Sequence, residues 1–218
     1  MGNNVSKNLM ETMMQGASIS RRSLIRGAAA SLLAMPAVSA AWADSADDFH
    51  PLPPFDYSKT PEAFRPAILN YKGRQRSGTV IVDTAARQIY LVLEGGKAMR
   101  WGCAVGKDGF RWAGLADVGR KVMWPRWTPP KEMIERSPEK AKWANGMPGG
   151  PENPLGARAL YRFQNGNDTL FRIHGTTEPK SIGTNASSGC IRMINQDVVE
   201  LFRRAPIGAR VVVLVEGV

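Results

Sequence analysis

The sequence contains few of the residues from which metal sites and disulfide frameworks are built. Only two cysteines, Cys103 and Cys190, and two histidines, His50 and His174, occur among its 218 residues. His174 and the two cysteines make three zinc ligands at most, and their spacing matches no common zinc motif. We therefore expect neither a metal nor another cofactor, and at most one disulfide bond.

Long apolar runs and several familiar motifs are also missing. No stretch reaches the roughly 18 to 20 consecutive apolar residues that a membrane-spanning helix requires. The chain has no internal repeat, no heptad pattern and no glycine fingerprint for nucleotide binding. These absences argue against a membrane-spanning protein, a coiled coil and a nucleotide-binding enzyme.

The first 43 residues have the features of an export signal. Three arginines within residues 21–26 precede a short apolar stretch over 27–35, and small residues follow it. Cleavage is expected after Ala40 or after Ala43. The adjacent arginines in SRRSLIR are typical of the twin-arginine route, with the general export route as the alternative. We expect an exported protein of the periplasm or cell envelope.

Acidic side chains are in the minority, since 19 Asp and Glu face 29 Lys and Arg, for a net charge of +10. Residues 1–43 account for +3 of this charge, which leaves +7 on the rest of the chain. A basic exported protein suits a polyanionic partner such as the cell wall, and the alternative is a solvated basic surface without a specific partner. We expect no nucleic-acid partner, because the basic residues are not interleaved with aromatic ones.

The rest of the chain divides into two parts. Residues 44–76 are polar and rich in proline, and we predict a linker there with one short helix over 61–69. From residue 77 the pattern is mainly that of short β-strands separated by turns. Predicted strands cover residues 79–83, 88–94, 98–106, 121–127, 157–163, 169–175 and 210–217. Helices are predicted after Pro129-Pro130 and over 195–205, the latter capped by Asn195. We predict a mostly β domain over 77–217, a sandwich or small barrel with two or three short helices.

The stretch HGTTEPKSIGTNASSGCIRM, residues 174–193, contains both a histidine and a cysteine. A thiol nucleophile needs a base, a group that orients the base and hydrogen-bond donors for the oxyanion. Cys190 follows small residues, precedes a predicted helix and has Arg192 nearby, all of which favour an accessible thiolate. His174 is the single histidine of the predicted domain and is therefore the expected base. The alternative is that His174 is a structural histidine of the core.

Residues around this pair are expected to fill the remaining roles. The carbonyl of Gly175 is expected to orient His174, and the backbone amides of Gly189 and Cys190 are expected to bind the oxyanion. Arg192 is expected to bind a substrate carboxylate, and the alternative is a solvated charge or a side chain that caps a nearby carbonyl. Further hydrogen bonds are expected from three polar side chains of the same stretch: Asn185, Ser187 and Ser188.

The same stretch resembles the signature of the L,D-transpeptidases with a YkuD-type catalytic domain, in which His-Gly is followed, after a spacer, by Ser/Thr-His-Gly-Cys-x-Arg/Asn. The segments VDTAARQIYLVLEGG, WTPP and GGPENPLGARALY also resemble the family, so that the resemblance covers about residues 77–217. Many members have a second histidine where this chain has Ser188. The role of base therefore falls on His174 alone.

The resemblance implies that the substrates are peptidoglycan stem peptides. Cys190 would form a thioester with the third stem residue and release D-Ala, and an amine of a second stem would complete a 3→3 cross-link. Two alternatives stay open. A cysteine-type L,D-carboxypeptidase or amidase would use water as the acceptor, and a non-enzymatic wall-binding domain would contain a Cys103–Cys190 disulfide. We expect a monomer.

Overall fold

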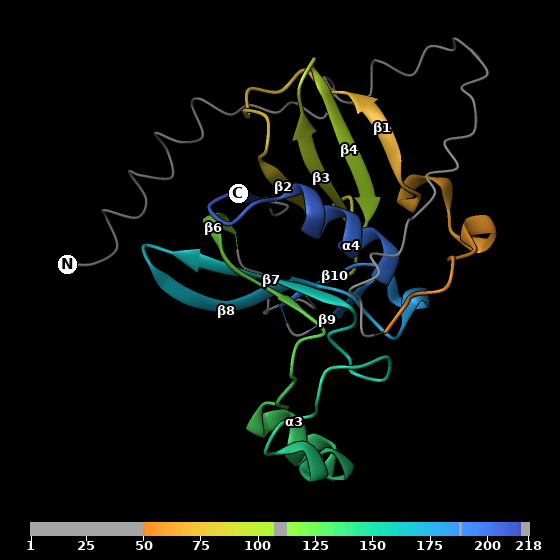
Figure 1. Ribbon diagram of the computed structural model, residues 1–218, viewed down its shortest axis with the longest axis vertical. Coiled ribbons are helices and arrows are strands. Elements are labelled where there is room, and N and C mark those ends of the chain that lie inside the picture. Colours follow the sequence, from red (N-terminus) through yellow and green to blue (C-terminus); the bar gives the residue numbers. More distant parts are fainter. Residues whose placement is uncertain (1–49, 107–112, 188, 215–218) are drawn as a thin grey trace.

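The computed structural model describes residues 50–106, 113–187 and 189–214 of the chain. In this part of the chain strands predominate and helices are short (Figure 1), which confirms the predicted mostly β fold class. The elements, with η for a 3₁₀-helix, are η1 (Tyr57–Lys59), η2 (Glu62–Phe64), β1 (Ala67–Asn70), β2 (Val80–Asp83), β3 (Gln88–Leu93), β4 (Lys97–Gly102), β5 (Val105–Gly106), β6 (Gly114–Met123), α3 (Lys131–Arg136), η3 (Pro138–Trp143), β7 (Arg158–Gln164), β8 (Asn167–His174), η4 (Pro179–Ser181), β9 (Asn185–Ser187), β10 (Ile191–Arg192), α4 (Asn195–Arg204) and β11 (Arg210–Leu214).

Nine of these strands form one sheet in the order β1-β4-β3-β2-β11-β6-β7-β8-β10, and β5 pairs with β9 in a second sheet. In the large sheet, β11 runs parallel to β2 and β10 runs parallel to β8, whereas the other neighbours are antiparallel. β11 lies in the middle and joins the half built from β1 to β4 to the half built from β6, β7, β8 and β10. Figure 1 shows the two halves at a large angle to each other, with α4 close to both.

The main core lies between the large sheet and α4. Apolar side chains of β2, β3, β6, β7, β8 and β11 are buried there together with Val198 and Leu201 of α4. The last turn of α4 presents Arg203 and Arg204 to solvent, as its sequence predicts. Burial of one valine or leucine side chain contributes about 1.5–3 kcal/mol. In α4, buried apolar residues and exposed arginines lie on different sides of the helix, and this distribution favours packing of the helix against the sheet.

Two hairpin turns expected from the sequence are present. Gly95 and Gly96, between β3 and β4, have φ angles of 68° and 65°, and Asn165 and Gly166, between β7 and β8, have φ angles of 51° and 78°. Two successive residues with positive φ are typical of tight hairpin turns whose twist matches that of antiparallel strands. The second turn holds β8 beside β7. His174 is the last residue of β8 and therefore lies at the end of the hairpin away from this turn.

Residues 50–66, which we call the strap, pack against the domain. The helix predicted over 61–69 is wrong beyond Phe64, where η2 ends, and the chain continues as β1 paired with β4. Pro66 explains this ending, because proline lacks an amide hydrogen and favours an extended preceding residue. Aromatic side chains of the strap pack on a small buried cluster that contains Ile182 and Ile194.

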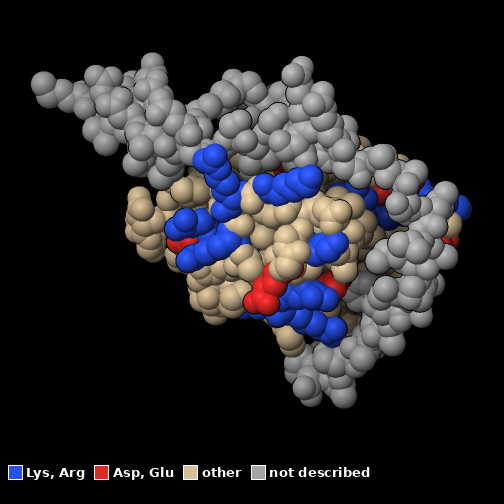
Figure 2. Space-filling model, turned by 90° about the horizontal axis from the view of Figure 1, so that it is seen from above, with Lys and Arg blue, Asp and Glu red and all other residues tan. Residues whose placement is uncertain are grey.

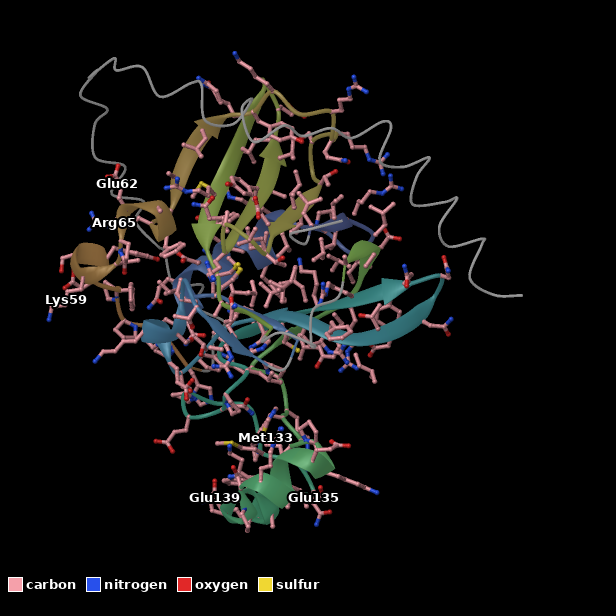
Figure 3. All side chains as sticks on the ribbon, turned by 180° about the vertical axis from the view of Figure 1, so that it is seen from behind. Lys59, Glu62, Arg65, Met133, Glu135 and Glu139 are labelled. Carbon is pink, nitrogen blue, oxygen red and sulfur yellow. The ribbon has the colours of Figure 1, made fainter. Side chains whose placement is uncertain are left out.

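Two hydrogen bonds join the strap to the first turn of α4. Gln196 donates from Nε2 to the carbonyl oxygen of Pro53 at 2.6 Å, and the Tyr57 hydroxyl donates to Oδ1 of Asp197 at 2.5 Å. Asp197 is fully buried, and this burial raises the pKa of its carboxyl group to about 8. Figure 3 shows Lys59, a charged residue of the strap, at the periphery of the molecule.

A small helical lobe projects from the sheets between β6 and β7 (Figures 1 and 3). It contains the helix predicted after Pro129-Pro130, which is α3, and the following η3. At the base of the lobe, buried Asn153 donates from Nδ2 to the carbonyl oxygens of Pro125 at 3.0 Å and Pro148 at 2.9 Å. Because these two prolines lie on the segments entering and leaving the lobe, Asn153 holds its base together.

Lysine and arginine side chains are prominent on the face shown in Figure 2, where few acidic side chains lie between them. This distribution follows from the excess of basic residues and favours contact with an anionic partner. In the described ranges, none of the helices combines the length and the apolar character needed to cross a membrane.

Candidate active site

His174 is the last residue of β8 and is almost fully buried. Its Nδ1 lies 2.6 Å from the carbonyl oxygen of Gly175. Because a carbonyl oxygen only accepts hydrogen bonds, this contact assigns the proton to Nδ1 and leaves Nε2 to accept a proton. Burial lowers the pKa of His174 to about 4, although backbone hydrogen bonding at Gly175 and Leu155 opposes this shift. The imidazole is therefore neutral at physiological pH.

Cys190 directly precedes β10, the strand that runs parallel to β8. The register of this pair places Ile191 opposite Ile173 and Arg192 opposite His174. Parallel pairing thus brings the strand of the cysteine beside the strand of the histidine, although sixteen positions of sequence separate the two residues. Cys190 is partly exposed as a residue, unlike the fully buried Cys103.

Neither Cys103 nor Cys190 forms a disulfide bond in the structure, and the two differ in their surroundings. Cys103 is fully buried, which raises the pKa of its thiol far above the usual range. Because the two cysteines are not bonded to each other, the structure lacks the Cys103–Cys190 disulfide that the non-enzymatic alternative requires. Among the described residues, no group of three or more His, Cys, Asp or Glu side chains could hold a metal ion.

Gly189 precedes Cys190 and is buried, with a φ angle of 111°. This conformation strongly favours glycine, because a Cβ atom would be strained there. The glycine thus allows the backbone to turn sharply just before the thiol. Ser188, the next predicted site residue, lies outside the described residues.

Asn185 and Ser187 lie on β9, which pairs with β5. The side-chain oxygen of Asn185 accepts a hydrogen bond from Nε of Arg87 at 3.1 Å. The sequence predicts a hydrogen bond from Asn185 to substrate, and in the structure its side-chain oxygen already has this protein partner. The roles of Asn185 and Ser187 toward a substrate therefore stay predictions.

Arg192 forms an ion pair that the sequence analysis did not include. Its Nη1 lies 2.9 Å from Oε2 of Glu178, and the two side chains are 24% and 69% exposed. The positive charge of Arg192 also helps to lower the pKa of His174. A partly exposed ion pair thus lies on the strand position that faces His174.

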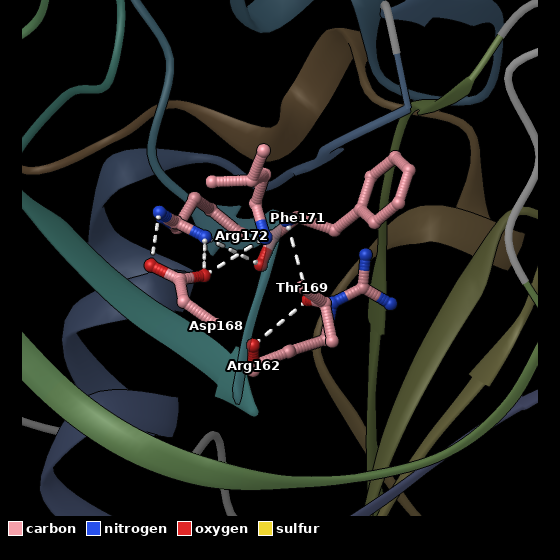
Figure 4. A network of polar contacts seen from close by, with 6 residues as sticks. Arg162, Asp168, Thr169, Phe171 and Arg172 are labelled. Carbon is pink, nitrogen blue, oxygen red and sulfur yellow. Dashed lines mark hydrogen bonds and ion pairs between the residues drawn. The ribbon is translucent and has the colours of Figure 1, made fainter. Parts of the chain in front are cut away.

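The sequence analysis also missed Arg162, which lies on β7 and is 1% exposed. Its guanidinium carbon is 5.4 Å from the centre of the Phe171 ring, beside the Arg172–Asp168 ion pair (Figure 4). Burial lowers the pKa of Arg162 to about 10, and negative charge on Cys190 opposes this shift. Arg162 is therefore cationic at neutral pH. In the sequence, the presence of arginine within the otherwise apolar run ARALYRF, residues 157–163, was the one indication of a buried charge.

Asn195 does not cap α4 as predicted. The helix begins at Asn195 itself, and no side chain caps it. The Asn195 side chain instead bonds to the backbone of Ala157 and of Thr176. Sequence alone gives no indication of these distant partners.

Comparison with known proteins gives consistent matches. The family model described as the L,D-transpeptidase catalytic domain matches residues 77–213. The L,D-transpeptidase-like ORF 5 of the ATP synthase subunits region of Fuscovulum blasticum is 34% identical over 137 residues, covering 62% of this chain and 68% of that protein. The probable L,D-transpeptidase YbiS of Escherichia coli K12 is 39% identical over 95 residues, covering 43% of this chain but only 29% of its own length.

A solved structure also resembles the fold. The Ldtfm–avibactam carbamoyl enzyme superimposes with a TM-score of 0.50 at 17% sequence identity, covering 66% of this chain and 51% of that one. At this identity the likeness concerns the fold alone.

Proposed function

Because the chain belongs to the family of L,D-transpeptidase catalytic domains, we propose that it is an exported acyltransferase of peptidoglycan stem peptides, with Cys190 as nucleophile and His174 as general base. The observation that carries the proposal is the parallel pairing of β8 with β10. It joins the strand that ends in a neutral, oriented imidazole to the strand that follows a partly exposed thiol. These are the two groups that thiol-based acyl transfer requires.

In the first half-reaction, Nε2 of His174 takes the proton of the Cys190 thiol. The thiolate attacks the carbonyl carbon of the third stem residue, an L-centre bonded to D-Ala. The backbone amides of Gly189 and Cys190 donate hydrogen bonds to the oxyanion, and the charge of Arg162 stabilises the attacking sulfur. As the C–N bond breaks, His174 returns the proton to the departing D-Ala amine, and a thioester remains on Cys190.

In the second half-reaction, an amine of a second stem peptide, such as the side chain of diaminopimelate, attacks the thioester. The amine loses a proton to His174 and the C–S bond breaks. That proton then passes to the sulfur of Cys190, which regenerates the thiol. The product is a 3→3 cross-link. Acyl transfer through a thioester consumes neither ATP nor a redox partner, which suits an exported enzyme.

The substrate is held mainly through its carboxylate groups in this proposal. Arg192 provides a guanidinium whose geometry matches a carboxylate, and its exposed partner Glu178 can be displaced. Asn185, Ser187 and Ser188 remain proposed hydrogen-bonding residues. The bond from Arg87 to Asn185 uses the side-chain oxygen, so the amide hydrogens of Asn185 are the groups proposed to meet substrate.

We propose the same division of the chain as the sequence predicts. Residues 1–43 are an export signal of the twin-arginine type, 44–76 are a linker, and 77–217 are the catalytic domain. The family match over 77–213 supports the boundaries of this domain. The linker does more than connect, because its strap forms hydrogen bonds with α4 and its residues 67–70 form β1. Export delivers the enzyme to the cell envelope, where its substrate is made.

The experiment that tests this function is an intact-mass measurement under non-reducing conditions, before and after incubation with tetrapeptide muropeptides. We expect a free thiol, an acyl adduct on Cys190, release of D-Ala and 3→3 dimers. Tripeptides without dimers would identify the hydrolytic alternative. The Cys190→Ala variant should lose both adduct and product, and the Cys103→Ala variant is the matched control that keeps them. Undiminished cross-linking by Cys190→Ala would overturn the proposal.

A further inference from the structure

The side chain of Asn195 joins three segments at the base of the site. Its Oδ1 accepts a hydrogen bond from the backbone amide of Ala157 at 2.9 Å, and its Nδ2 donates to the carbonyl oxygen of Thr176 at 3.1 Å. Ala157 directly precedes β7, and Thr176 follows His174 by two positions. One amide group thus ties the start of α4 to the entry into β7 and to the loop that leaves β8.

Two glycines pack directly against this amide group. A Cβ atom added to Gly175 would lie 2.1 Å from Oδ1 of Asn195, and one added to Gly156 would lie 2.2 Å from the same atom. Atoms that are not bonded do not approach so closely. Gly156 also has a φ angle of 64°, a conformation that favours glycine. The backbone around His174 is therefore fitted closely to the Asn195 side chain.

The position of Gly175 matters because its carbonyl oxygen accepts the hydrogen bond from Nδ1 of His174. The amide of Gly175 is fixed by a bond to the carbonyl oxygen of Arg158 at 3.1 Å. The next residue, Thr176, is fixed through its own carbonyl by Asn195. Gly175 is thus restrained on both sides. The orientation of the imidazole therefore depends on Asn195 through one intervening peptide unit.

We propose that Asn195 is a positioning residue of the active site. It keeps the Gly175 carbonyl where that group fixes the tautomer and the orientation of His174, without itself contacting the reacting sulfur. In cysteine and serine hydrolases this task belongs to an Asn or Asp bonded directly to the histidine. Here the backbone carbonyl of Gly175 contacts the histidine directly, and Asn195 acts on that carbonyl through the neighbouring residue, Thr176. The inference rests on the proposed roles of His174 and Cys190.

The test is the rate at which iodoacetamide alkylates Cys190 in the whole protein over about pH 5 to 9, with the modified site mapped by peptide mass. Asn195→Ala removes both hydrogen bonds. Asn195→Asp keeps the acceptor for Ala157 and loses the donor for Thr176. Gln196→Ala is the matched control, because it removes an amide from the neighbouring residue of the same helical turn, and this amide donates to the strap at Pro53. Thermal unfolding of each variant reports whether it folds.

We expect both Asn195 variants to lose about tenfold or more in the alkylation rate at neutral pH. Their pH profiles should move toward that of His174→Ala, while Gln196→Ala keeps the native profile. A purely structural role would lower thermal stability without moving the profile. A folded Asn195 variant that keeps the native pH profile overturns the inference. If Asn195→Ala does not fold, the profile of the near-isosteric Asn195→Asp variant decides between the two outcomes. A native profile in His174→Ala would overturn the proposed function instead.

Discussion

At the scale of single residues, the chemistry of the site follows from where His174 lies. Its ring is withdrawn from water at the end of β8, and burial is the largest cause of its lowered pKa. The nearby positive charge of Arg192 acts in the same direction. A general base must be unprotonated before it can act. In the proposed mechanism, burial therefore keeps this base unprotonated at neutral pH.

The pH dependence of activity follows from this position. We predict that kcat/KM for a muropeptide tetrapeptide falls as the pH drops through about 4, the pKa of buried His174, because the imidazolium cannot accept the thiol proton. An exposed histidine would place this decline near pH 6.5. Circular dichroism at each pH verifies that the enzyme stays folded. A decline centred near 6.5 would contradict the prediction.

The Arg192–Glu178 pair gives a second prediction at this scale. Arg192→Gln should raise KM about tenfold or more, because a bonded carboxylate of the substrate loses its charged partner. Glu178→Gln should change KM by less than about fivefold, since exposed ion pairs contribute up to about 1 kcal/mol. Steady-state kinetics measure both.

The matched control for these variants is Glu200→Gln, which breaks the Glu200–Arg204 pair on α4. It should leave KM unchanged. Equal effects of the Arg192 and Glu200 substitutions would remove Arg192 from the substrate site.

At the scale of elements, local patterns predict β2, β3, β7, β8 and α4, because their apolar periodicity and turn residues lie within each segment. The strand predicted over 121–127 is wrong beyond Met123, and the longest strand, β6, begins already at Gly114, because its pairing with β11 and β7 extends it through glycines and charged residues. Strands β9 and β10 escape prediction, since they contain three and two residues and exist only through pairing with distant strands. β1 was missed because the prolines around it favour a linker. The roles of His174 and Cys190 were predicted from their motif. The roles of Arg162, Glu178 and Asn195 depend on tertiary contacts that sequence spacing does not encode.

The strap gives a prediction for an element. Tyr57→Phe removes the hydroxyl that donates to buried Asp197, and a buried acceptor that loses its donor costs about 1–3 kcal/mol. We expect this loss in the free energy of unfolding, measured by urea titration at neutral pH. The control is Tyr90→Phe, whose hydroxyl bonds to partly exposed Gln88 two positions away. That change should cost less than about 1 kcal/mol. Equal effects would show that the strap adds no stability through Tyr57.

At the scale of the whole molecule, two buried groups make stability depend on pH in opposite directions. His174 has a folded pKa of about 4, below its unfolded value, so its contribution to stability is lost as the pH falls toward 4. Asp197 has a folded pKa of about 8, above its unfolded value, so stability falls as the pH rises from about 4 to 8. The two effects oppose each other up to about pH 6.5, above which only that of Asp197 remains.

We therefore predict that the free energy of unfolding falls by about 2 kcal/mol between pH 6.5 and 8. Asp197→Asn removes the titrating group and should abolish this decline, while stability then rises from about pH 4 to 6.5 because of His174. Urea titrations at a series of pH values measure both slopes. A native protein whose stability stays constant from pH 6.5 to 8 would contradict the role assigned to Asp197.

The central place of β11 in the sheet has a consequence for how the protein is made. β11 follows every other described strand in the chain, yet it lies between β2 and β6. A ribosome adds about 5–20 residues per second, so the two halves of the sheet emerge before the strand that joins them. Until then the edges of β2 and β6 stay unpaired, and such edges invite aggregation. The nascent chain therefore needs protection until synthesis of residues 210–214 is complete and the sheet can close.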